Sequence, residues 1–149
     1  MSHDNQEDEP VNNTAAMTPQ DALAAMMVAV SASDETMRTA ELLKITNIVE
    51  TLPVFGGYDP DKLRLVSQMV FELFEQEDGL DALFGLIRDA LPERLYETAY
   101  ALACDVAASD GVIAQSELRL LEEMRYELNL DRLHAAAIER GARARHLTI

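Results

Sequence analysis

The sequence has little of what several classes of protein require. Its 149 residues include one cysteine, Cys104, which has no partner for an internal disulfide, so no oxidising compartment is indicated. The apolar run Leu23–Val30 is far shorter than the roughly 20 residues of a membrane-spanning helix. No Lys or Arg precedes Arg38, so the basic flank of a secretory signal is missing. We therefore expect a cytoplasmic protein with no direct insertion into a membrane.

Positive charge is also scarce. The chain contains twelve Lys and Arg residues and 27 Asp and Glu residues, which gives a formal net charge of −15. Such a chain repels phosphate backbones and anionic headgroups, so binding of DNA or RNA is not expected. Cations and basic protein surfaces are the natural complements of this charge, although solubility alone also explains it.

Turn-forming and aromatic residues are few as well. Six glycines and five prolines are too few for the many turns of an all-β protein. Aromatic residues make up 5% of the chain and Trp is absent, although 48% of the residues are hydrophobic. The core must therefore consist mainly of Leu, Val, Ile, Ala and Met, of which Ala, Leu and Met are strong helix formers. This composition predicts an all-α fold.

The pattern of apolar residues divides the chain into a tail and one helical domain. Residues 1–16 are polar and acidic without an apolar period, which predicts a disordered tail before a domain over 17–149. Helical spacing and capping signals predict about seven helices, which begin near residues 18, 39, 59, 80, 92, 114 and 131. We expect an irregular bundle with the helix that follows Leu91-Pro92 at its centre, because this segment is rich in small residues.

One loop-plus-helix unit occurs twice in the chain. An offset of 76 residues aligns Asp34 with Asp110 and Glu41 with Glu117, and the apolar rhythm on both sides also matches. Each copy consists of a helix, a Ser-Asp loop and a second helix with Glu in its first turn. Such a duplication predicts an internal pseudo-twofold repeat, in which the two acidic loops can lie near each other.

The repeated acids have two possible roles. Carboxylate oxygens suit hard divalent cations, so Asp34, Glu41, Asp110 and Glu117 are candidate metal ligands, and Asp105 is a candidate third carboxylate of the second loop. The same residue types are also ordinary helix caps. The distance between the two Asp carboxylates decides between these roles. Like charges closer than roughly 6 Å need a cation or a proton, whereas capping suffices for distant ones.

The segments SASDETMRTAE and AASDGVIAQSE resemble the TerB-like tellurite-resistance family over residues 18–145. The resemblance implies an all-helical fold with a duplicated acidic loop, and an acidic surface that binds a divalent metal such as Ca²⁺, Mg²⁺, Mn²⁺ or Zn²⁺. It also implies a bacterial stress response with protein partners, membrane-associated ones among them. By position, the acidic residues of the family fall on Asp34, Glu41, Asp110 and Glu117.

Motifs of catalysis are missing from the sequence. There is no Gly-rich phosphate loop, no nucleophile elbow and no HExxH, and the three His residues are scattered. We therefore expect a non-enzymatic module that binds a cation or a protein partner. Two alternatives stay open: a metal-independent adaptor whose acids are helix caps, and an enzyme that uses clustered carboxylates for metal-assisted hydrolysis. The sequence does not indicate an oligomeric state.

Overall fold

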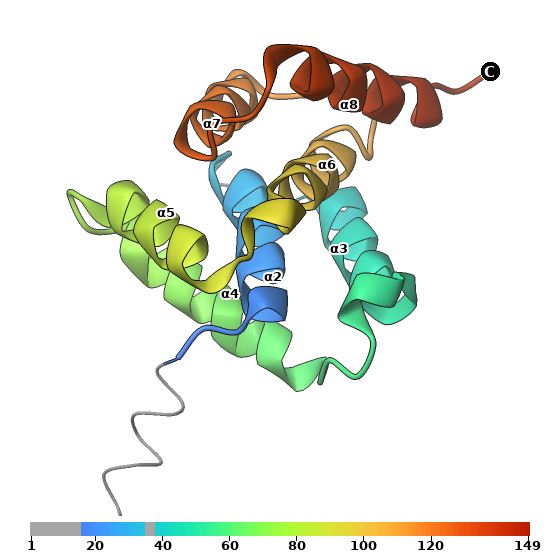
Figure 1. Ribbon diagram of the computed structural model, residues 1–149. Helices are drawn as coiled ribbons and strands as arrows, with labels where there is room; N and C mark the ends of the chain where they lie inside the picture. Colours follow the sequence, from blue (N-terminus) through green and yellow to red (C-terminus); the bar gives the residue numbers. More distant parts are fainter. Residues whose placement is uncertain (1–15, 35–37) are drawn as a thin grey trace, which may run out of the picture.

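The computed structural model describes residues 16–34 and 38–149, which form seven α-helices and two short 3₁₀ turns without any strand (Figure 1). The predicted all-α class is therefore confirmed. The predicted disordered tail, apart from residue 16, lies outside the described residues. The elements are α2 (Pro19–Ala32), α3 (Thr39–Thr51), η2 (Pro53–Phe55), α4 (Asp61–Phe74), α5 (Gly79–Ala90), η3 (Glu93–Leu95), α6 (Tyr96–Ala107), α7 (Gln115–Glu127) and α8 (Arg132–Arg145).

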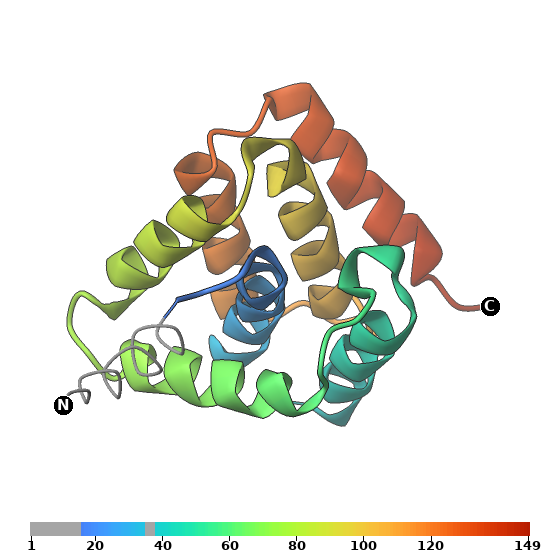
Figure 2. The same cartoon turned by 60° about the horizontal axis from the view of Figure 1, so that its bottom comes forward.

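The central helix is α2, which corrects the expectation that α6 would hold this place. Every residue from Asp21 to Ser31 is buried, and α2 packs against α3, α4, α5, α6 and α7, which surround it in Figure 2. The physical reason is that α2 is apolar on all sides over Leu23–Val30, and a helix without a polar face is stable only when it is enclosed. Pro19 begins this helix, and Thr18 and Asp21 form a capping box.

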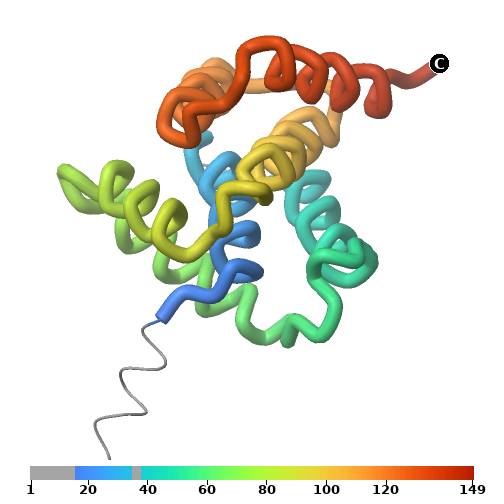
Figure 3. Tube along the Cα trace, in the orientation of Figure 1, coloured from blue at the N-terminus to red at the C-terminus, as the bar shows by residue number. Residues whose placement is uncertain are grey.

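The second buried helix is α6, which lies against α2 and is covered by α7 and α8 (Figure 3). Its side towards the core carries Ala99, Ala103 and Ala107, all of them fully buried. These small side chains let the backbones of α2 and α6 approach closely. The two closely packed helices are the first helices of the two predicted repeat units, so both acidic loops start from one paired core.

The start of α6 differs from the prediction. A helix was expected directly after Leu91-Pro92, but Pro92 is extended, with φ −61° and ψ 144°, and η3 comes before α6.

Among the described residues, no helix is long and apolar enough to cross a membrane. Whether a twofold rotation relates the two repeat units stays a prediction.

Candidate acidic site

The four aligned acids lie at corresponding places in the fold. Asp34 and Asp110 follow the ends of α2 and α6, and Glu41 and Glu117 stand in the first turns of α3 and α7. The serine before each Asp closes the preceding helix in the same way. The hydroxyl of Ser33 donates to the carbonyl of Val30 at 2.7 Å, and that of Ser109 donates to the carbonyl of Val106 at 2.8 Å.

Arg38 joins the two loops. Its guanidinium donates to Oδ2 of Asp110 at 2.6 Å and to Oδ2 of Asp34 at 3.1 Å, and Oε1 of Glu117 lies 3.8 Å from Nη2. A further bond, of 2.9 Å, reaches the carbonyl of Val112. One cation of the chain therefore holds both aspartates together, which is the condition that closely spaced like charges require. The contacts with Asp110 and Asp34 raise the pKa of Arg38, so the guanidinium stays charged.

Beneath Arg38, Glu41 and Glu117 form a fully buried pair, each with 0% of its surface exposed. Taken as ionised groups, both oxygens of Glu41 and Oε2 of Glu117 have no hydrogen-bond donor among the described residues. A buried carboxylate without a donor is costly, so this pair needs either a proton or a cation. We call Asp34, Arg38, Glu41, Asp110 and Glu117 together the acidic cluster.

A proton satisfies part of this need. Burial, and then the adjacent Glu41 carboxylate, raise the pKa of Glu117 to about 8, against the opposing effects of the Ala114 N–H and Arg38. Glu117 is therefore largely protonated at neutral pH. Its hydroxyl then acts as the donor of the hydrogen bond that joins it to Glu41.

The aspartate nearest to Arg38 behaves in the opposite way. Partial burial acts to raise the pKa of Asp110, but the Arg38 guanidinium and the N–H of Val112 outweigh it, so the pKa lies below its ordinary value of 3.8. Besides Glu117, the carboxyl groups of Asp34, Asp110 and Glu41 are gathered around this one guanidinium. The acidic cluster therefore contains more acidic than basic groups.

Two of the four acids also serve as caps. Oδ1 of Asp110 accepts from the N–H of Val112 at 3.0 Å in an Asx-turn, and Gly111 has φ +82°, a conformation that favours glycine. Oε1 of Glu117 accepts from the N–H of Ala114 at 3.1 Å. The buried Glu41 caps nothing among the described residues. Capping therefore explains Asp110 and Glu117 in part and leaves Glu41 without an explanation.

Asp105, the fifth candidate ligand, is engaged elsewhere. Asp105 lies on α6, and its Oδ1 accepts a hydrogen bond of 2.6 Å from the guanidinium of Arg145, which lies on α8. No hydrogen bond or ion pair of the described residues joins it to the acidic cluster. The structure thus brings four of the five predicted residues together and pairs the fifth with a different arginine.

Sequence reasoning missed Arg38. The repeat alignment sets Arg38 opposite Ala114, so a search for residues that the two copies share passes over it. One signal was present, because Arg38 is the first basic residue of the chain and lies between Asp34 and Glu41. Within the described ranges, no three Asp, Glu, His or Cys residues stand in the arrangement of a formed metal site.

A comparison with protein-family models matches residues 20–140 to TerB, described as tellurite resistance protein TerB. Searches of the curated proteins and of the solved structures returned no match. The matched residues cover most of the chain and include both acidic loops, all four aligned acids and Arg38. The chain belongs to the TerB family of tellurite resistance proteins.

Proposed function

We propose that this protein is a non-enzymatic cytoplasmic module of the tellurite and stress response, and that its acidic cluster binds one divalent cation between the two repeated loops. In this proposal the cation replaces Arg38 as the positive charge between Asp34 and Asp110, and the bound state is what protein partners recognise. Membership of the TerB family supports the tellurite-related role.

The observation that carries the cation proposal is the buried Glu41. Apart from the hydroxyl of protonated Glu117, its oxygens have no hydrogen-bond donor among the described residues, and Glu117 in turn lies 3.8 Å from Arg38. Asp34 and Asp110 above it are still accessible, with side chains 27% and 24% exposed. Because Arg38 is itself 25% exposed, it can leave towards solvent and open the cluster to an ion.

The types of ligand atom in the acidic cluster limit which divalent cations can bind there. All four candidate ligands are carboxylates, and no His or Cys belongs to the acidic cluster. Ca²⁺, Mg²⁺ and Mn²⁺ prefer oxygen ligands, whereas Zn²⁺ sites usually contain nitrogen or sulfur. The proposal therefore favours Ca²⁺, Mg²⁺ or Mn²⁺ over Zn²⁺.

Thermal unfolding with and without divalent cations tests this proposal. An ion that binds only the folded chain stabilises it by about 2.7 kcal/mol at a hundredfold excess over Kd. We expect Ca²⁺ to raise the melting temperature of the wild type and chelator to reverse the rise. The Asp34→Asn/Asp110→Asn variant should show little response. Arg38→Gln should respond more strongly than the wild type, because the internal competitor is gone.

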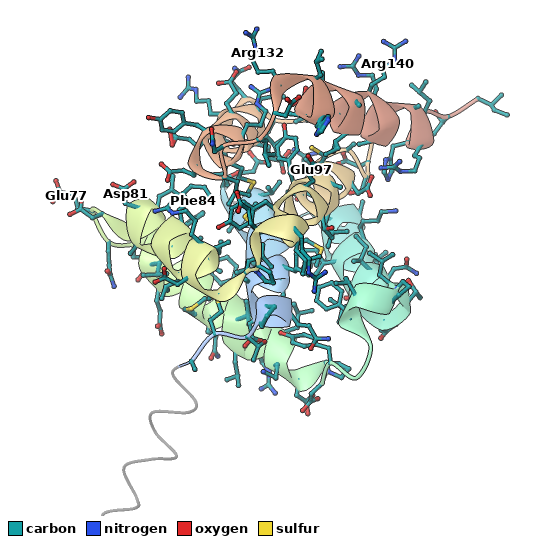
Figure 4. The ribbon with its side chains drawn as sticks, in the orientation of Figure 1. Glu77, Asp81, Phe84, Glu97, Arg132 and Arg140 are labelled. Atoms are coloured by element: carbon teal, nitrogen blue, oxygen red, sulfur yellow. The ribbon has the colours of Figure 1, made fainter. Side chains whose placement is uncertain are left out.

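A charge-matched variant supplies the control. Glu77→Gln/Asp81→Asn removes the same charge from the turn before α5 and from the first turn of α5, at the left edge of the molecule in Figure 4. It should keep the full wild-type response to Ca²⁺. Equal responses of the wild type and of Asp34→Asn/Asp110→Asn would contradict the proposal, because screening of net charge would then explain the effect.

The alternative is a metal-independent adaptor, and the caps made by Asp110 and Glu117 favour it. In that case Arg38 is the permanent cation of the cluster. The adaptor predicts that Asp34→Asn/Asp110→Asn restores tellurite resistance to a host lacking this protein as well as the wild type does. The cation proposal predicts that the variant fails to restore it at equal protein level.

A further inference from the structure

A cavity of about 560 Å³ lies between α6, α7 and α8. This volume falls within the roughly 300–1,000 Å³ of small-molecule sites in proteins. Neither Arg38 nor any of the four aligned acids lines it, so it is separate from the acidic cluster. The proposed cation function does not use this cavity.

The floor of the cavity is formed by small apolar side chains, which leave space between the helices. Cys104, Ala108 and Ala142 line the cavity, and each is at most 5% exposed. Burial raises the pKa of Cys104 to about 12, so its thiol is neutral and behaves as an apolar surface. Leu121 of α7 completes this floor.

The lining of the cavity contains more arginines than acidic residues. The arginines are Arg119, Arg125 and Arg143, and the acidic residues are Glu122 and Glu139. Arg125 is engaged, since it donates to Glu139 at 2.7 Å, and the hydroxyl of Tyr100 donates to the same carboxylate. Arg119 and Arg143, from two different helices, form no ion pair within the described part of the chain. These two guanidinium groups are therefore available to an anion at the cavity.

Three further lining residues expose apolar surface, beside the polar Gln115 and His146. Ile113, Leu118 and Leu147 are 39%, 41% and 73% exposed. Tyr100 and His146 are the two lining residues with planar rings. Tyr100 is only 1% exposed, and its hydroxyl donates to Glu139, whereas Nδ1 of His146 lies 2.8 Å from the carbonyl oxygen of Ala142. The exposed apolar side chains of the lining are all aliphatic, which suits an alkyl chain.

We propose that this cavity binds a single-chain anionic amphiphile, a medium-chain carboxylate. Its head group lies at Arg119 and Arg143, where a carboxylate can accept guanidinium hydrogen bonds. Its alkyl chain covers Cys104, Ala108 and Leu121 and removes their apolar surface from water. This site is independent of the proposed cation function, and either can fail without the other.

Calorimetric titration with decanoate, decanol and decyltrimethylammonium, all below their micelle concentrations, tests the head group and the chain separately. We expect saturable binding of decanoate at one molecule per chain, at least about tenfold tighter than decanol, with no binding of the cationic probe. Arg119→Gln/Arg143→Gln should remove this tenfold preference. Arg132→Gln/Arg140→Gln is the matched control, because both arginines lie on α8 outside the lining and point away from the body of the molecule (Figure 4).

A second variant tests the cavity itself. Ala142→Leu places a larger side chain in the floor and should weaken decanoate and decanol alike, with the fold checked by circular dichroism. If Ala142→Leu does not fold, the Arg119→Gln/Arg143→Gln variant still tests the proposal through the preference for decanoate over decanol. The proposal is overturned by equal affinities for decanoate and decanol, by an unchanged preference in the arginine variant, or by a lack of saturable decanoate binding to the folded wild type. A dimer of the wild type that decanoate does not dissociate would assign the cavity to a second copy, which also overturns it.

Discussion

At the scale of single residues, Arg38 and Glu117 explain how so many carboxylates coexist. Arg38 supplies a positive charge that reaches both aspartates, and a proton on Glu117 satisfies part of the hydrogen-bonding need of the buried pair. The repeat alignment identified the four acids, because their spacing is a property of the sequence. It did not identify Arg38, because the second copy has Ala114 at that position. The partner of Asp105 depends on how α8 packs, which its local sequence does not reveal.

The raised pKa of Glu117 predicts a loss of stability at alkaline pH. The folded-state pKa of about 8 lies above the ordinary value of 4.5, so folding favours the protonated carboxyl. This contribution to the free energy of unfolding is complete below about pH 4.5 and is lost as the pH rises through about 8. Between about pH 5.5 and pH 8.5 we expect a loss of about 3 kcal/mol in chelator, measured by urea unfolding.

Two variants isolate this effect. Glu117→Gln should lose most of the pH dependence, since the amide does not ionise. Glu123→Gln, an exposed position on the same helix, should keep the wild-type dependence. A Glu117→Gln profile parallel to that of the wild type would show that other groups cause the pH dependence.

At the scale of the elements, the helices could be predicted because Pro and capping residues mark where they begin. The predicted start of the helix near residue 39 agrees with α3, which begins at Thr39. The helix after Leu91-Pro92 was placed too early, because Pro92 suits both an extended residue and a first helical residue. The choice between α2 and α6 as central helix depends on tertiary packing. The run Leu23–Val30 was the available signal, since an all-round apolar helix must be enclosed.

The turn between α4 and α5 gives a prediction about backbone packing. A Cβ atom at Gly79 would lie 1.5 Å from the carbonyl oxygen of Leu73, so the chain must shift to accept alanine. We expect Gly79→Ala to lower the free energy of unfolding by about 1–3 kcal/mol, measured by urea unfolding. Gly85→Ala, in the same helix with no atom within 4 Å of the new Cβ, should be neutral or stabilise by up to about 1 kcal/mol. Similar effects of both substitutions would mean that the close approach at Gly79 does not limit stability.

At the scale of the whole molecule, charge is unevenly distributed. The chain carries a net charge of −15, yet half of its twelve Lys and Arg residues lie in α7 and α8. Two of them, Arg119 and Arg143, line the cavity between α6, α7 and α8. Composition predicted the all-α class, because it reflects helix propensity and the scarcity of turn residues. It could not predict the cavity, which arises only where three helices place small side chains together.

The proposed cation function requires that the two repeated loops form one shared cation site rather than two separate sites. Titration calorimetry of Ca²⁺ into the wild type and into Asp34→Asn and Asp110→Asn, each alone, tests it most directly. Because Arg38 contacts both aspartates, we expect one ion per chain and at least about tenfold weaker binding in either single variant. Two independent ions per chain, of which each single substitution removes only one, would contradict the shared site, as would heats that neither substitution changes.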